Sequence, residues 1–128
     1  MKVGVVGLGL IGGSMAKAVK KKTDHEVIGW DVSETIRYSA LLMEAVHGFM
    51  DNGNPKDCDI VIIGLYPQLT VDYIKEHAKD FKKGAIVVIF PLLFISSIFL
   101  SKLANTLFQF TSKNKLFYLC ISYVIFLL

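Results

Sequence analysis

The stretch that decides the fold of this chain is Lys2-Val3-Gly4-Val5-Val6 followed by Gly7-Leu8-Gly9-Leu10-Ile11-Gly12-Gly13-Ser14. The valine-rich run is typical of a buried strand in a parallel sheet. The three glycines of the G-x-G-x-x-G spacing have separate roles: a tight turn, close approach of a pyrophosphate to the backbone, and close packing of the next helix on the strand. Gly7, Gly9 and Gly12 occupy these positions in that order. The free N–H groups of the following helix would then face the phosphates.

A helix and a second strand are predicted directly after the glycines. The helix covers residues 14–22, and its expected apolar face is formed by Ile11, Met15, Ala18 and Val19. The strand covers residues 26–31 and ends in Asp31, 19 residues after Gly12, where the fingerprint expects an acid that accepts the ribose hydroxyls. A helix cap is the alternative role for Asp31, although Ser33 could fill that role instead. Strand, glycines, helix and acid together predict dinucleotide binding.

The remaining sequence up to residue 89 alternates further helices and strands. The predicted elements are a helix over 34–46, a polar connection over 48–59, a buried strand over 59–65, a loop over 66–68, a helix over 71–81 capped by Thr70, and a strand over 85–89. This alternation predicts an α/β fold, a Rossmann-type doubly wound parallel sheet. Ligands of such sheets bind beyond the carboxyl ends of the strands, where the strand order reverses. Leu65, Tyr66 and Pro67 are therefore expected to join the glycines and Asp31 in one site.

Composition divides the chain into a domain of residues 1–89 and an apolar tail of residues 90–128. The first part carries 11 Lys plus Arg and 11 Asp plus Glu, so the net charge of +3 comes from three lysines in a tail without acids. A basic face that could follow nucleic-acid phosphates is therefore not expected. Cys58 and Cys120 are isolated and show neither metal-ligand nor disulfide spacing, and the three histidines have no catalytic partners at a suggestive spacing. With the first strand beginning at Lys2, no leader is predicted, and the cytoplasm is the expected location.

Residues 2–88 resemble the amino-terminal nucleotide-binding part of the prephenate dehydrogenase family. The motifs that carry the resemblance are the glycine stretch and residues 27–31, 57–62 and 81–87. The resemblance implies NAD-dependent oxidation of prephenate to 4-hydroxyphenylpyruvate in tyrosine biosynthesis, with loss of carbon dioxide. It also implies which residues bind the cofactor: Gly7, Gly9, Leu10, Ile11, Gly12, Asp31, Leu65, Tyr66 and Pro67. Arogenate stays open as an alternative substrate.

The resemblance stops near Val88. There the family continues with an Asp, a Ser-Val-Lys stretch, a His-Pro-Met-Ala-Gly motif and a helical domain that forms a homodimer, and none of these follows here. No catalytic residue is therefore assigned, and residues 85–89 are expected near an edge of an incomplete sheet. The tail is interpreted as a shifted reading frame or truncation in an A/T-rich gene. The alternatives are a membrane-associated tail, although it lacks about 20 continuous apolar residues, and a non-catalytic dinucleotide-binding module.

Overall fold

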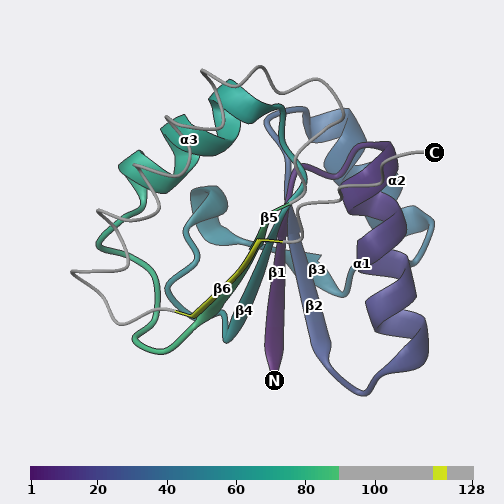
Figure 1. The fold of residues 1–128 in the computed structure, drawn as a ribbon. Helices are drawn as coiled ribbons and strands as arrows, with labels where there is room; N and C mark the ends of the chain where they lie inside the picture. The colour runs from purple at the N-terminus through teal and green to yellow at the C-terminus, as the bar shows by residue number, and fades with distance from the viewer. Residues whose placement is uncertain (90–116, 121–128) are drawn as a thin grey trace, which may run out of the picture.

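The computed structural model describes residues 1–89 and 117–120 (Figure 1). Its elements in chain order are β1 (Lys2–Val6), α1 (Leu10–Lys22), β2 (Glu26–Trp30), α2 (Glu34–Leu42), β3 (Gly48–Phe49), the 3-10 helix η1 (Asp51–Gly53), β4 (Ile60–Ile63), α3 (Pro67–Glu76), β5 (Ile86–Ile89) and β6 (Phe117–Cys120). Strands and helices alternate through most of this order, as the sequence predicts. The chain therefore has the expected α/β architecture.

The strands form one sheet in the order β3-β2-β1-β4-β5-β6, and every neighbouring pair is parallel. In the centre, Val5 of β1 is paired with Gly29 of β2 on one side and Ile62 of β4 on the other. The order runs outward from β1 to β3 and then returns to the other side of β1 with β4. The strand order thus reverses at β1, which confirms the Rossmann-type sheet. The point of reversal, where such sheets bind their ligands, lies between the carboxyl ends of β1 and β4, beside the glycine turn.

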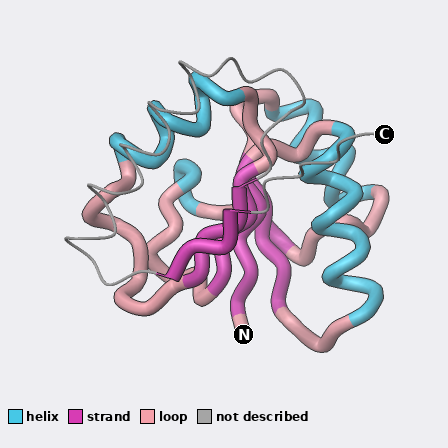
Figure 2. Tube along the Cα trace, viewed as in Figure 1, coloured by secondary structure: helices cyan, strands magenta, loops and turns pink. Residues whose placement is uncertain are grey.

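Helices cover both faces of the sheet (Figure 2). On one face, Val3 and Val5 of β1 belong to a core that includes Ala16 of α1 and Ala40 of α2. On the other face, Val6 belongs to a second core that includes residues of α3 and the fully buried Val61 and Val87. Because the central strands are covered on both faces, their sequences are continuously apolar rather than alternating.

The first helix differs from the prediction in its start and in its buried face. It begins at Leu10 rather than at residue 14, and its buried residues are Gly12 and Ala16. Ile11 and Ala18, both assigned to the apolar face, are exposed. The reason is that α1 lies close against the glycine turn, where only small side chains fit between helix and strand.

Helix α2 is shorter than the sequence predicts. It ends at Leu42 instead of residue 46, and Glu44 has a positive φ of 56° that a continuing helix does not allow. Val46 is buried as expected, but Met43 is 68% exposed because the chain turns away before the next helical turn. The connection predicted over 48–59 contains β3 and η1.

The third helix begins earlier than predicted. Pro67 is its first residue, a position that needs no N–H donor, so the predicted loop over 66–68 is wrong. Thr70 lies inside the helix and is not its cap: its hydroxyl is buried and lies within hydrogen-bond distance of the carbonyl oxygens of Leu65 and Tyr66. The helix ends at Glu76 rather than at residue 81, and Phe81 packs into the core from the following turn.

The outer side of β5 is covered by β6, whose residues 117–120 pair in parallel with Ile86–Ile89. Residues 85–89 are thus near an edge of the sheet, as expected, but β5 is not itself the edge strand, because β6 lies beyond it. The interpretation of the tail otherwise concerns residues 90–116 and 121–128, which lie outside the described residues. Among the described residues, no helix is long and apolar enough to cross a membrane.

Candidate functional site

The turn after β1 requires a glycine at position 7. Gly7 has a φ of 83°, a conformation that residues with a Cβ rarely adopt. Its N–H donates to the carbonyl of Trp30 at 2.8 Å, and a Cβ on Gly7 would lie 2.8 Å from the carbonyl oxygen of Gly64. The turn is thus fixed between the ends of β2 and β4, and its conformation requires a glycine at position 7.

Gly12 brings α1 into contact with that turn. A Cβ on Gly12 would lie 1.7 Å from the carbonyl oxygen of Gly7, a distance that no side chain can occupy. Gly64, at the end of β4, closes the contact from the other side, since its own Cβ would lie 3.1 Å from the Cα of Gly12. Gly64 is not among the site residues predicted from the sequence. Its signal there is a glycine directly after a continuously apolar strand.

Gly9 and the first turn of α1 face open space. Gly9 is the N-cap residue, with an ordinary φ of −67° and no side-chain capping bond, and a Cβ there would meet nothing within 4 Å. Leu10 is 89% exposed and Ile11 37% exposed, and the first turn carries no acidic side chain. The backbone N–H groups at this helix start are therefore suited to an anion such as a pyrophosphate.

Asp31 lies beside the turn because β2 is the neighbour of β1. One carboxylate oxygen accepts the N–H of Leu8 at 3.0 Å, and the other accepts the N–H of Ser33 at 2.9 Å. The helix cap is Ser33, whose hydroxyl accepts the N–H of Ile36, so capping is not the role of Asp31. An ionised carboxylate has about four acceptor sites. With two of them in use, acceptor capacity is left for ribose hydroxyls.

Leu65, Tyr66 and Pro67 follow β4 and reach the same edge of the sheet. A methyl group of Leu65 would lie 2.9 Å from a Cβ on Gly7, so this side chain borders the glycine turn. Tyr66 is the N-cap residue of α3 and its side chain is 70% exposed, while Pro67 opens the helix. All nine predicted cofactor-binding residues are thus located at the carboxyl ends of β1, β2 and β4.

Arg37 is a cation at this edge that the sequence analysis did not single out. Its Nη1 donates to the backbone carbonyl oxygen of Asp31 at 2.9 Å, and its guanidinium carbon lies 4.4 Å from the centre of the Trp30 ring. A guanidinium stacks favourably on an aromatic face. In the sequence, Arg37 is an arginine six positions after a strand-terminal acid. This spacing does not predict a contact, and only the structure shows that Arg37 lies against Asp31 and Trp30.

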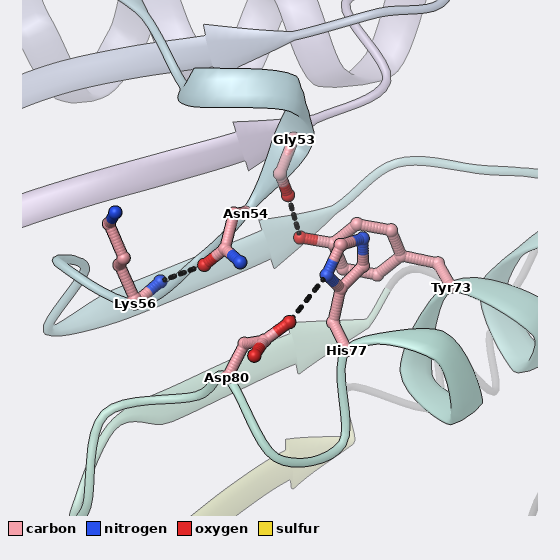
Figure 3. Close-up of polar contacts among 6 residues, drawn as sticks. All are labelled: Gly53, Asn54, Lys56, Tyr73, His77 and Asp80. Carbon is pink, nitrogen blue, oxygen red and sulfur yellow. Dashed lines mark hydrogen bonds and ion pairs between the residues drawn. The ribbon is translucent and has the colours of Figure 1, made fainter.

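The other polar groups lie away from the glycine turn. Figure 3 shows the hydroxyl of Tyr73 donating to the carbonyl of Gly53 at 2.7 Å, with the imidazole of His77 3.1 Å from Asp80. Burial raises the pKa of Tyr73, so this hydroxyl stays protonated and joins α3 to η1. Burial also raises the pKa of the Cys58 thiol to about 11. Among the described residues, no cluster of His, Cys, Asp and Glu could hold a metal ion.

A separate pocket of about 280 Å³ lies near β3 and η1. Its polar lining includes Lys2, Glu26, His47 and Asp57. These charges are partly engaged, because Lys2 pairs with Glu26 at 3.4 Å and Nδ1 of His47 accepts the N–H of Val27. The pocket lining includes none of the nine predicted cofactor-binding residues.

Comparison with known proteins agrees with this geometry. Residues 2–91 match the family model described as the NAD binding domain of 6-phosphogluconate dehydrogenase, while no curated protein matches the chain. Arogenate dehydrogenase of Synechocystis is 25% identical, with a TM-score of 0.74 over 88% of this chain and 38% of that one. Prephenate dehydrogenase of A. aeolicus, solved with hydroxyphenyl propionate and NAD+, is 19% identical, with a TM-score of 0.71 over 84% and 38%.

A third similar structure is the 3-hydroxyisobutyrate dehydrogenase of Mycobacterium tuberculosis, 17% identical with a TM-score of 0.74 over 91% of this chain and 38% of that one. The chain thus spans 38% of the length of each of the three structures. Several dehydrogenases with different substrates share this fold, so the family is broader than the resemblance to prephenate dehydrogenases implied. Since the family match extends over most of the chain, the protein belongs to the NAD-binding domains of the 6-phosphogluconate dehydrogenase type.

Proposed function

We propose that this chain binds NAD across the carboxyl ends of β1, β2 and β4, as the cofactor-binding part of a prephenate dehydrogenase. The observation that carries the proposal is the open space at Gly9, over the uncapped start of α1 and next to the carboxylate of Asp31. A pyrophosphate and a ribose need these two features side by side.

Each predicted residue has a definite role in this proposal. Gly7 and Gly12 shape the turn and bring α1 close to it, while the N–H groups of Leu10 and Ile11 donate to the pyrophosphate. Asp31 accepts the ribose hydroxyls and at the same time holds Leu8 in place through its N–H. Leu65, Tyr66 and Pro67 border the remaining part of the cofactor. The cofactor, when bound, supplies the hydride acceptor, and the residues of this chain hold and orient it.

Prephenate is favoured as the substrate of the larger enzyme by the resemblance carried by residues 7–14, together with residues 27–31, 57–62 and 81–87. Arogenate is the second candidate, since one of the similar structures is an arogenate dehydrogenase at 25% identity. We expect the 128-residue chain alone to bind NAD without oxidising either substrate. Holding the reacting atoms together contributes up to roughly 7–11 kcal/mol to such reactions, and the motifs that would hold the substrate do not follow Val88.

Binding can be tested with the intrinsic fluorescence of Trp30, the single tryptophan, which is located at the end of β2. NADH added to the chain should quench this emission by energy transfer. NAD should then displace the bound NADH and restore the emission. Gly9→Ala is the matched variant, because its Cβ enters the open space without touching the protein. Absence of quenching in the native chain, or equal NADH affinity in Gly9→Ala, would contradict the proposed site.

The substrate assignment needs a separate measurement. The chain is incubated with NAD and either prephenate or arogenate, and NADH formation is followed at its absorbance band. Reduction of NAD above the blank would show that these residues already contain a substrate site. The shifted-frame interpretation of the tail predicts that the DNA after the codon for Val88 encodes the Ser-Val-Lys and His-Pro-Met-Ala-Gly motifs in another frame.

A further inference from the structure

We propose that the pocket near β3 and η1 is a second ligand site, which binds a free α-amino acid with an apolar side chain. Its lining includes the first residues of β1, β2 and β3, namely Lys2, Glu26 and Gly48. Because these strands are parallel, the three residues lie at the opposite edge of the sheet from the glycine turn. Binding at this edge is therefore independent of the predicted cofactor-binding residues.

The pocket arises from the connection between β3 and β4. The connections from β1 to β2, from β2 to β3 and from β4 to β5 each contain an α-helix, whereas residues 50–59 contain only the 3-10 helix η1. This short helix lies on the same face of the sheet as α3, where the hydroxyl of Tyr73 donates to the carbonyl of Gly53 (Figure 3). A single 3-10 turn covers less of a sheet than a crossover helix does, so part of this face is left open at β2 and β3.

Gly48 shows that the space above the start of β3 is empty. A Cβ on Gly48 would meet nothing within 4 Å, and its φ lies outside the left-handed region. Gly48 pairs with Ile28, so Ile28 and Met50 lie on the same face of the sheet, where both belong to its apolar packing. The pocket volume of about 280 Å³ is just below the roughly 300–1,000 Å³ that is usual for drug-sized ligands. An apolar floor of this size suits the side chain of a small metabolite.

The rim of the pocket carries charges of both signs. Asp51, Lys56 and Asp57 are exposed, and none of these three side chains forms a hydrogen bond or an ion pair with another described residue. The other two charges of the lining neutralise each other, because Lys2 pairs with Glu26 at 3.4 Å. One cation and two carboxylates are thus left for a ligand. They match a zwitterion, whose ammonium group needs acceptors and whose carboxylate needs a cation, and they disfavour a phosphate.

Two neutral donors complement the charge of Lys56. Nδ1 of His47 accepts the N–H of Val27 at 3.0 Å, so the neutral ring carries its hydrogen on Nε2, which is left as a donor. Oδ1 of Asn54 accepts the backbone N–H of Lys56 at 3.0 Å, which leaves the amide N–H groups of Asn54 for a ligand. The pocket therefore combines donors for a carboxylate, acceptors for an ammonium group and an apolar floor for a side chain.

The test follows L-leucine binding to the full chain by saturation-transfer NMR, which detects the millimolar affinity expected of so small a ligand. L-leucine is compared with 4-methylpentanoate, which lacks the ammonium group, and with 3-methylbutylamine, which lacks the carboxylate. We expect each analogue to bind at least about tenfold more weakly than L-leucine, because it loses a charge-assisted contact. Saturating NADH should leave L-leucine binding unchanged, since the two sites lie at opposite edges of the sheet.

Three variants locate the binding. Gly48→Val fills the empty space with a side chain that strands accept, and Lys56→Met removes the charge but keeps most of the stem. We expect each to weaken L-leucine binding at least about tenfold, and Lys56→Met to leave 3-methylbutylamine binding unchanged. Lys79→Met, at an exposed lysine outside the pocket, is the matched control and should bind L-leucine as the native chain does. If Gly48→Val lowers the urea unfolding midpoint, Gly48→Ala replaces it.

Four results would overturn the second site. The first is no saturation transfer from the native chain to L-leucine, and the second is equal binding of L-leucine and both analogues, which would reduce the pocket to an apolar hollow. The third is unchanged L-leucine binding in Lys56→Met or in the Gly48 variant. The fourth is displacement of L-leucine by NADH, which would place the amino acid at the cofactor edge.

Discussion

Replacing Gly12 with alanine tests the packing that forms the site. The new Cβ would lie 1.7 Å from the carbonyl oxygen of Gly7, whereas ordinary contacts begin at 3.4 Å. The turn cannot yield, because the N–H of Gly7 is bonded to Trp30 and its other side is closed by Gly64. Helix α1 must therefore move away from the sheet.

The expected cost follows from two opposing effects. Overpacking of a well-packed site costs about 1–3 kcal/mol and occasionally more, and a clash of a Cβ with a fixed backbone carbonyl belongs to the upper end. Alanine regains up to about 1 kcal/mol of helix propensity relative to glycine. The net loss should be about 2 kcal/mol or more, a large part of the ~5–15 kcal/mol that stabilises a typical domain.

The assay is urea unfolding followed by the fluorescence of Trp30, with Gly9→Ala as the control. In the control the Cβ meets nothing within 4 Å and φ is −67°, so only a capping cost of about 0.5–1 kcal/mol is expected. Gly12→Ala should lose stability and cofactor binding together, whereas Gly9→Ala should lose mainly binding. Equal stability of the two variants would refute the packing argument.

Three other measurements address groups outside the glycine turn. Since burial raises the pKa of Cys58 to about 11, its thiol should react slowly with iodoacetamide at pH 8 in the native chain and rapidly in urea. The measurement uses a chain in which the second cysteine is replaced by serine, and equal rates with and without urea would contradict the burial of the thiol. The hydrogen bond from Lys82 lowers the pKa of Asp59, so the stability from this pair is present above the unfolded-state pKa of Asp59 and is lost as pH falls. Lys82→Met should therefore reduce the difference in the urea unfolding midpoint between pH 7 and pH 3, and an unchanged difference would show that the pair does not contribute. Tyr73→Phe leaves the buried carbonyl of Gly53 without this donor and should cost about 1–3 kcal/mol in urea unfolding, and a neutral result would show that the hydroxyl does not join α3 to η1.

The helix boundaries show where sequence reasoning is weakest. The predicted second helix continued to residue 46 because Met43 and Val46 extend its apolar spacing, but Glu44 takes a positive φ and the chain turns toward β3. The predicted cap at Thr70 followed a local preference, yet Pro67 already starts the helix and the Thr70 hydroxyl is buried within it. In both places the packing of distant segments outweighs the local preference.

The sequence by itself determined the parallel α/β fold and predicted where the candidate site lies, because both depend on local properties. Continuous apolar strands, the spacing of Gly7, Gly9 and Gly12, and an acid at the end of the second strand act over short stretches of chain. Only the tertiary structure decided that Gly64 completes the glycine contact and that β6 covers β5. It also placed Arg37 over Trp30. These features join residues from different elements, and contacts of that kind are set by how the sheet and helices pack.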